Sequence, residues 1–304
     1  MKRVLLLGAT GMLGSAVYNV LRDKYDLTIT ARDVDKLFLL TKPLLHSSEG
    51  VAYLKNPSRT AAFDAEQMMA DYTAKKGSAY FSDFVKRIGE VDYVINAIGV
   101  TIPFALKNPG LTFFVNSALP HILAREFGPR LIHITTDCVY SGTDGSAPYN
   151  EYSPFSPMDI YGLSKNLGEP KTCLTIRTSI IGEELSGHTG LLGWFLSNAK
   201  PGAVLNGFTD HLWNGLTTKQ FGLVCDRIMD GPLTLPAPYR TGLYHVFTNP
   251  VTKFEMLQAF QKRFGTQAEI KPASGNPVIR TMSTAYALND WLKIPSFDQM
   301  IEEM

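Results

Sequence analysis

A tyrosine and a lysine four residues apart could form a proton-transferring pair. Tyr161 and Lys165 lie in the stretch YGLSKNLGE at 161–169, and residues at this spacing share one face of a helix. Free tyrosine, with a pKa near ~10, is a poor acid–base catalyst at neutral pH. A neighbouring ammonium favours the phenolate, so we expect Lys165 to lower the pKa of Tyr161. Exposed helices carry this pair by chance as well, and the pair alone identifies no site.

A threonine lies upstream of this pair, at the end of an expected strand. The apolar run at 131–135 reads as a buried strand, and Thr136 follows it directly. Ligands of open α/β sheets bind beyond the carboxyl ends of the strands. Thr136 is therefore predicted to donate a second hydrogen bond to the substrate oxygen that exchanges a proton with Tyr161. This hydrogen bond is strongest as negative charge develops on that oxygen.

A glycine-rich turn near the N-terminus is predicted to hold a cofactor. The apolar run at 4–7 leads into GATGMLG at 8–14 and then into a helical pattern. Gly8 would allow the tight turn, Gly11 the approach of a pyrophosphate, and Gly14 close helix packing. The spacing differs from G-x-G-x-x-G, and a glycine-rich turn of any α/β protein remains the alternative. The predicted cofactor contacts of this turn are Gly8, Thr10, Gly11, Met12, Leu13 and Gly14.

The end of the second expected strand, at 27–31, bears on the choice of cofactor. A carboxylate at this point binds the ribose 2′-hydroxyl of NAD, whereas an arginine accommodates the 2′-phosphate of NADP. Arg32 and Asp33 both follow the strand. A guanidinium matches phosphate bidentately and stays charged, so NADP is the favoured cofactor and NAD the alternative.

The order of elements predicts an α/β protein with a doubly wound parallel sheet. Strands are expected at 60–63, 91–96 and 174–182 besides those above, and helical stretches at 65–89 and 111–127 separate them. We expect a Rossmann-type dinucleotide-binding domain at 1–181 and a smaller substrate-binding region at 182–304, part of which returns to the sheet near 242–250. Residues 34–57 have no clear periodicity.

Composition excludes several classes of protein. The 304 residues carry a net charge of +1, so there is no electrostatic footprint for nucleic acid. The six histidines and three cysteines are scattered without metal-ligand spacing, which predicts no metal site and a reducing compartment. No apolar stretch approaches the length of a membrane span. We therefore expect a soluble cytoplasmic protein, with a homodimer as the assembly considered.

Five motifs together resemble the extended short-chain dehydrogenases/reductases, and among them the nucleotide-sugar reductases of the dTDP-4-dehydrorhamnose reductase type. They cover the first 180 residues well. The motifs are GATGMLG at 8–14, NAIG at 96–99, TTDCVYSG at 135–142, PYNE at 148–151 and YGLSKNLGE at 161–169. The resemblance implies NADPH-dependent reduction of the 4-keto group of a nucleotide-linked deoxy sugar.

The resemblance also assigns roles to residues. Thr136, Tyr161 and Lys165 fall on the catalytic triad of the family, with Lys165 also holding the nicotinamide ribose. Asp64 falls where the family meets the adenine. Ala97 and Ile98 lie in the NAIG motif, where the loop lines the cofactor.

Two residues leave a second reaction open. Asp137 is followed by Cys138 and not by the glutamate of the 4,6-dehydratases, so dehydration is not expected. GDP-fucose synthases, which epimerise and then reduce, resemble this chain in having Cys138 at that offset and a histidine, here His188, six residues after Gly182. Each residue has an ordinary structural alternative, and the plain reductase is favoured. A third hypothesis is a non-catalytic regulatory subunit with the same fold, as in partners of methionine adenosyltransferase.

The last third is predicted less closely. An amphipathic helix is expected at 253–264. Trp194 is expected in the core, whereas Trp213, in an aromatic and glycine-rich loop at 207–215, is a candidate for stacking on the substrate or for anchoring the loop. Arg280 resembles the position at which extended members of the superfamily clamp the substrate diphosphate, and a surface arginine is the alternative.

Overall fold

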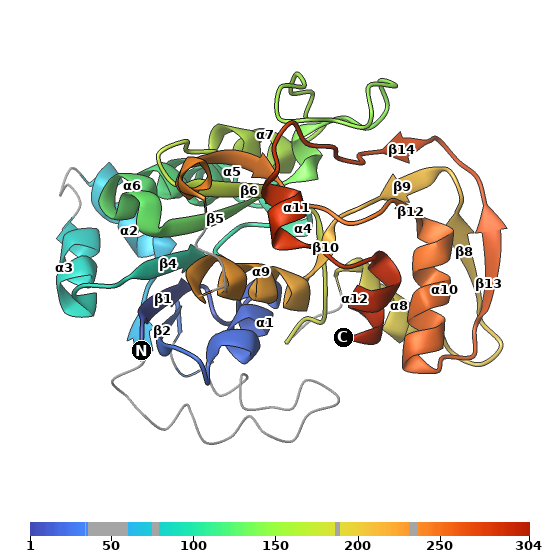
Figure 1. The fold of residues 1–304 in the computed structure, drawn as a ribbon, viewed down its shortest axis with the longest axis horizontal. Helices are drawn as coiled ribbons and strands as arrows, with labels where there is room; N and C mark the ends of the chain where they lie inside the picture. Colours follow the sequence, from blue (N-terminus) through green and yellow to red (C-terminus); the bar gives the residue numbers. More distant parts are fainter. Residues whose placement is uncertain (34, 36–59, 75–78, 186–188, 231–235) are drawn as a thin grey trace.

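The computed structural model is built on a seven-stranded parallel sheet (Figure 1). The structure describes residues 1–33, 35, 60–74, 79–185, 189–230 and 236–304, so most of the irregular stretch at 34–57 lies outside the described residues. The strand order is β11-β6-β5-β4-β1-β2-β3, and every neighbouring pair is parallel. This is the predicted doubly wound sheet. The strands are β1 Arg3–Leu7, β2 Asp26–Ala31, β3 Thr60–Ala62, β4 Tyr93–Asn96, β5 Leu131–Thr136, β6 Leu174–Thr178 and β11 Gly242–His245.

Both faces of the sheet are covered. Val4 and Leu6 pack into one apolar core with the helices α1 and α9, whereas Leu5 and Leu7 pack into a second core with α2, α3 and α6. A strand buried on both faces reads as an unbroken apolar run, which explains the sequence of β1. The helices of the sheet layers are α1 Met12–Leu21, α2 Ala65–Thr73, α3 Ala79–Ile88, α4 Ile102–Ala105, α5 Pro109–Phe113, α6 Leu119–Phe127, α7 Ile160–Leu167 and α9 Thr218–Asp230.

The helix expected at 111–127 is continuous but irregular. A π-helical turn at Phe114–Ala118 joins α5 to α6. Such turns inside helices are frequent at functional sites. Here the turn contains Asn116, whose side chain reaches towards α7.

The C-terminal part forms smaller sheets beside the main one. In Figure 1 the helix α10 and the strand pair β8–β13 lie at the end of the molecule away from α3. The strand β9 lies between β12 and β14 in a three-stranded sheet. The elements are β7 Ile180–Ile181, α8 Leu191–Asn198, β8 Val204–Phe208, β9 His211–Trp213, β10 Leu216–Thr217, β12 Val251–Thr252, α10 Lys253–Phe264, β13 Glu269–Ala273, β14 Val278–Ile279, α11 Leu288–Leu292 and α12 Phe297–Glu302.

Three expectations for this part are wrong in detail. The strand expected at 174–182 breaks at Ser179, whose carbonyl accepts the amide of Leu216 at 2.8 Å, and the next two residues pair with β10. The loop expected at 207–215 contains the end of β8 and all of β9. Trp194 is 39% exposed, because α8 buries only the side that carries Leu192 and Phe195.

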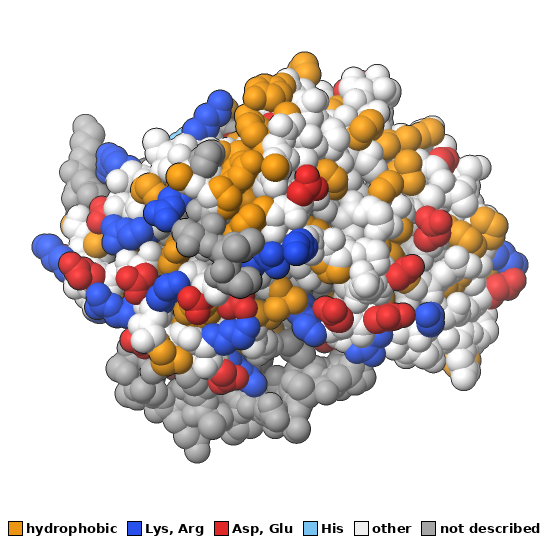
Figure 2. All heavy atoms as spheres, in the orientation of Figure 1, with side chains coloured by type: hydrophobic (Ala, Val, Ile, Leu, Met, Phe, Trp, Pro, Cys, Tyr) orange, Lys and Arg blue, Asp and Glu red, His pale blue; other side chains and the backbone are white. Residues whose placement is uncertain are grey.

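The two predicted regions share one core. Phe221 and Val224 of α9 lie in the same apolar core as Val17 of α1. The two helices pack closely, since a Cβ atom on Gly222 would stand 2.9 Å from a methyl carbon of Val20. On the face drawn in Figure 2, acidic and basic side chains are interspersed across the middle of the molecule. No helix among the described residues is long and apolar enough to cross a bilayer.

Candidate active site

The loop after β5 and the helix α7 bring Thr136 and Tyr161 together. The Thr136 hydroxyl accepts the amide of Cys138 at 3.2 Å, which fixes the turn that ends the strand. Asp159 caps the start of α7 by accepting the amide of Gly162 at 2.7 Å. A Cβ atom on Gly162 would stand 2.2 Å from the Cys138 carbonyl oxygen, so only glycine lets the helix approach this closely.

The pKa of Tyr161 is raised and not lowered. Burial is the largest cause, the nearby Cys138 adds to it, and the Thr136 side chain acts in the opposite direction. The expectation that Lys165 holds this pKa below its ordinary value is therefore wrong. The reason is that the phenol is shielded from water and faces acidic neighbours, including Asp137. A phenol that stays protonated at neutral pH is a proton donor.

Lys165 lies behind Tyr161, on the same face of α7. Its side chain is 6% exposed, and Nζ donates a hydrogen bond to the carbonyl oxygen of Ile134 at 2.9 Å. Burial lowers the pKa of Lys165 to about 8, while the carboxylate of Glu169 acts to raise it. At pH 7 the ammonium is mostly protonated and has two further hydrogens with which to bind a ligand.

Asn116 ties the loop after β4 to α7. Its amide accepts the backbone N–H of Val100 at 2.9 Å and donates to the carbonyl of Val100 and to the Ser164 hydroxyl, at 2.9 and 3.1 Å. A residue in the π-helical turn thus holds the helix that carries the tyrosine and the lysine. The helix expected at 111–127 includes Asn116, but this role of its side chain could not be predicted, since no local signal in the sequence marks a π-helical turn.

A buried ion pair lies next to Lys165. Arg177 of β6 is fully buried, and its guanidinium binds the carboxylate of Glu169 with Nη2–Oε2 and Nε–Oε1 distances of 2.5 and 3.0 Å. The Thr135 hydroxyl donates to the same carboxylate at 3.0 Å. His245 accepts from the Arg177 guanidinium at 2.9 Å. Burial and the adjacent guanidinium lower the pKa of His245 to about 4, so the imidazole is neutral at pH 7.

A second region, which we call the nucleotide cleft, opens beside the glycine turn. Its volume is about 550 Å³. Gly8 has a φ of +81°, which favours glycine, and a Cβ atom on Gly14 would stand 2.1 Å from the Gly8 oxygen. Gly11 is the N-cap of α1 and has no side chain to cap the helix, so the first amides of α1 are available to an anion.

The structure brings most of the predicted cofactor residues to this cleft. Its lining includes Gly8, Thr10, Gly11, Arg32, Asp64, Ala97 and Ile98. Asp64 also caps α2 by accepting the amide of Glu66 at 2.9 Å. Asp33 is exposed and does not line the cleft. Met12, Leu13 and Gly14 lie in the first turn of α1 and contribute no side chain to the lining, and Leu13 packs into the core.

The predicted substrate residues differ in position. The Arg280 side chain donates from Nε to the carbonyl of Tyr140 at 2.9 Å, and its Nη1 lies 3.8 Å from Cys138 Sγ. Burial raises the pKa of the Cys138 thiol to about 12. Trp213 is 5% exposed and packs edge-on against Phe297, so it has no open face on which to stack a base or sugar. Its role as an anchor is the better interpretation. His188 lies outside the described residues.

A doubly wound sheet with a nucleotide cleft and a Thr–Tyr–Lys cluster defines an oxidoreductase of the extended short-chain dehydrogenase/reductase class. Within that class, a family model described as the RmlD substrate binding domain matches residues 1–284, and the chain belongs to this family.

Two curated relatives match shorter stretches. The chain is 27% identical over 188 residues to the spore coat polysaccharide biosynthesis protein SpsK of Bacillus subtilis, with 59% of this chain and 63% of that protein aligned. It is 38% identical over 85 residues to the dTDP-4-dehydrorhamnose reductase of Mycobacterium tuberculosis, with 26% of this chain and 28% of that protein aligned. The chain thus covers less than two thirds of each relative.

Solved structures share the fold over nearly the whole chain. A dTDP-4-dehydrorhamnose reductase from Bacillus anthracis, in complex with NADP, is 18% identical with a TM-score of 0.65 and covers 100% of this chain and 98% of its own. The L-threonine 3-dehydrogenase of Trypanosoma brucei is 16% identical with a TM-score of 0.69, covering 100% and 95%. At these identities the likeness concerns the fold alone.

Proposed function

We propose that the protein reduces the 4-keto group of a nucleotide-activated deoxy sugar with NADPH. The observation that carries this proposal is the close packing of α7, which holds Tyr161, against the turn that follows Thr136 at the carboxyl end of β5, with the Lys165 ammonium hydrogen-bonded to the carbonyl of Ile134 on the same strand. The family match and the relatives named as dTDP-4-dehydrorhamnose reductases support the choice of substrate class.

The roles of the chain's residues follow from this geometry. The nicotinamide, when bound, supplies the hydride that goes to the carbonyl carbon. Tyr161 gives its phenolic proton to the carbonyl oxygen, and its raised pKa keeps that proton in place until the transfer. The Thr136 hydroxyl stabilises the same oxygen as negative charge develops. Lys165, held by the carbonyl of Ile134, directs its remaining donors to the ribose.

Arg32 supports NADP over NAD. It is the first residue after β2 and lines the nucleotide cleft, and its side chain is 67% exposed, so it can turn towards a phosphate. Its Nη1 lies 3.9 Å from the carboxylate of Glu66, which is a weak surface pair. Asp33, the alternative ribose reader, lies outside the cleft lining. The NADP in the Bacillus anthracis reductase agrees with this preference.

Cys138 disfavours the epimerase–reductase alternative. A thiol whose pKa is about 12 stays protonated near neutral pH and is a weak base for removing a proton from carbon. The intact Thr136, Tyr161 and Lys165 cluster likewise disfavours a purely regulatory subunit. We retain cytoplasmic location as a prediction, supported by the sparse cysteines.

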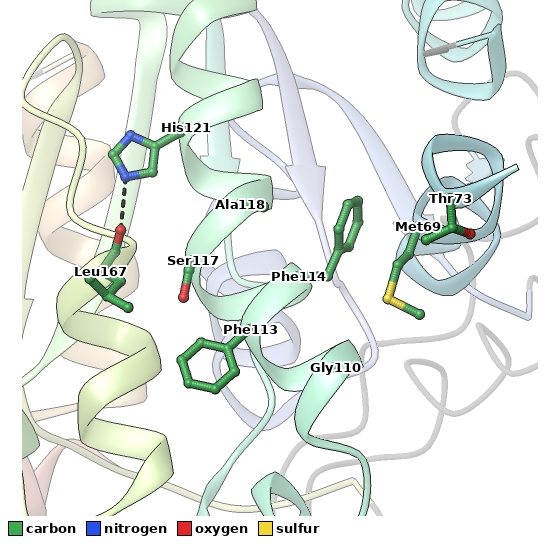
Figure 3. A pocket seen from close by; sticks show the side chains of 9 residues that line it. All are labelled: Met69, Thr73, Gly110, Phe113, Phe114, Ser117, Ala118, His121 and Leu167. Atoms are coloured by element: carbon green, nitrogen blue, oxygen red, sulfur yellow. Dashed lines mark hydrogen bonds between the residues drawn. The ribbon is translucent and has the colours of Figure 1, made fainter. Parts of the chain in front are cut away.

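An apolar groove supports a homodimer. The groove, of about 590 Å³, is lined from α2, the π-helical turn and the end of α7 (Figure 3). In Figure 3, Phe113 and Leu167 lie on one side of the turn, whereas Phe114 points towards Met69 on the other. Leu163 and Leu167 are 42% and 53% exposed, and a second copy of the chain would bury them.

The test is NADPH oxidation with 4-keto-6-deoxy sugar nucleotides carrying thymidine, uridine or guanosine diphosphate. Tyr161→Phe should lower turnover by about 10²–10⁴-fold, with NADPH binding unchanged. The matched control is Tyr152→Phe, since Tyr152 is 72% exposed. Wild-type turnover in Tyr161→Phe would refute the assignment. In D₂O, enzyme-dependent deuterium at C3 or C5 of the sugar that is lost in Cys138→Ser would establish epimerisation instead.

A further inference from the structure

Lys253 occupies a position that costs the fold stability. It is the first residue of α10, where the positive end of the helix dipole disfavours a cation. The helix does not need it, because Thr252 and Glu255 already cap the first turn with reciprocal hydrogen bonds. The side chain is partly buried, and its ammonium makes no hydrogen bond or ion pair with any other residue in the described part of the chain.

The side chain of Lys253 lies near Trp213 and the loop after β5. Its Nζ lies 6.0 Å from the centre of the Trp213 ring. Burial lowers the pKa of Lys253, Asp137 and Cys138 act to raise it, and the Arg280 guanidinium lowers it. Strand pairing gives the same placement, because Thr252 before Lys253 and Ile279 before Arg280 both pair with Leu212 of β9, and Arg280 contacts the loop after β5.

The small sheet brings two cations together at this place. Lys253 follows β12 and Arg280 follows β14, and both strands pair with β9, which ends at Trp213. Arg280 is directed at the same loop, with Nη1 3.8 Å from Cys138 Sγ. The two like charges repel, although Asp137 of the loop after β5 attracts the Lys253 ammonium more strongly. Within the described residues neither cation has a carboxylate partner at ion-pair distance. An anion bound between them would remove that cost.

We propose that Lys253 is a substrate-binding residue which, together with Arg280, holds the diphosphate of the nucleotide sugar. This inference rests on the proposed function for its substrate class. A diphosphate carries the two negative charges that two cations match, and the apolar ring of Trp213 beside the ammonium strengthens the attraction by excluding water. Lys253 thus acts on binding and leaves the proton transfer to Tyr161.

The experiment measures binding to the protein saturated with NADP⁺, so that the cofactor's own pyrophosphate site is filled. Lys253→Met should weaken the binding of dTDP, UDP and inorganic pyrophosphate by about ten- to a hundredfold, because a charge-assisted contact is lost. Thymidine, which has no phosphate, should bind the variant and the wild type equally. In turnover the KM should rise while kcat changes little, and Lys253→Arg should restore part of the affinity.

The matched control is Lys262→Met on the same helix, since Lys262 is 81% exposed and pairs with Glu302 at 3.6 Å. Its binding of dTDP should equal that of the wild type. Circular dichroism and melting temperature verify that both variants are folded.

A carboxylate on the sugar is the other source of negative charge. If Lys253→Met weakens the binding of UDP-glucuronate tenfold more than the binding of UDP and UDP-glucose, the lysine binds the carboxylate of the sugar. That result would overturn the diphosphate assignment. Unchanged dTDP and pyrophosphate binding would also overturn it, even where Tyr161-dependent ketosugar reduction is observed. Conversely, lost pyrophosphate binding without any ketosugar reduction would support the anion site and refute the proposed reductase.

Discussion

Replacing Glu169 by glutamine tests the buried ion pair beside Lys165. The change keeps the shape of the side chain and removes its charge, which leaves the fully buried guanidinium of Arg177 without compensation. Removing one partner of such a pair typically costs about 3–5 kcal/mol of the free energy of unfolding. The upper part of this range is expected, because Arg177 makes two hydrogen bonds to the carboxylate and has 0% side-chain exposure.

The same substitution should change the pH profile of catalysis. The carboxylate of Glu169 raises the pKa of Lys165, which burial has lowered to about 8. Without that carboxylate the pKa falls further, so the ammonium is lost at a lower pH. The alkaline limb of the kcat profile should therefore move towards neutral pH.

Urea unfolding at pH 7, followed by circular dichroism, measures the loss of stability. The control is Glu302→Gln, which breaks the exposed pair with Lys262 and should cost about 0–1 kcal/mol. In a double-mutant cycle with Arg177→Met, the coupling free energy should reach about 2–3 kcal/mol. A loss in Glu169→Gln no larger than in Glu302→Gln, or an unmoved alkaline limb, would refute this account of the pair.

Two further predictions concern the cofactor and the buried Lys165. Arg32→Ala should weaken NADPH binding roughly ten- to a hundredfold and leave NADH binding unchanged, as measured by fluorescence titration. Asp33→Asn should alter neither affinity. An unchanged cofactor preference in Arg32→Ala would instead assign binding of the ribose 2′-hydroxyl to Asp33. For Lys165, burial lowers the pKa from 10.5 to about 8, so between these values the unfolded chain binds more protons and folding stability rises with pH. The stability of wild type relative to Lys165→Met should rise by up to about 3 kcal/mol between pH 7 and pH 10.5, at ~1.4 kcal/mol per pKa unit, and a pH-independent difference would contradict the assigned burial cost.

The glycine turn and the sheet could be predicted because their constraints are local. The turn requires a positive φ at Gly8 and leaves no room for a Cβ atom at position 14. Both requirements are met by glycines, so the turn can be predicted from the local sequence. The strands at 27–31, 60–63, 91–96 and 131–135 were predicted to within two residues. The run at 4–7 is the clearest case, since a strand buried on both faces is uniformly apolar.

Properties that depend on distant partners could not be predicted. The spacing of Tyr161 and Lys165 indicated one helix face, but the pKa of the phenol depends on burial beneath a loop from another strand. The environments of Trp194, which is more exposed than expected, and of Trp213, which takes the anchoring role of its two alternatives, could not be predicted for a similar reason. An apolar run on α8 does not say which side faces the core, and the pairing of β9 with β12 decides that Trp213 is buried.

Lys253 illustrates the same limit for function. In the sequence Lys253 begins an amphipathic helix, where a lysine is expected to be a solvent-exposed charge. Helix periodicity alone predicts no binding role for it. The pairing of β12 and β14 with one central strand brings it near Arg280, from which it is 27 residues away in the chain. The proposed catalytic residues lie within one stretch of 30 residues, 136–165, whereas the proposed anion site joins two segments across a small sheet. This difference explains why the chemistry can be inferred from motifs, while recognition of the substrate has to be inferred from the fold.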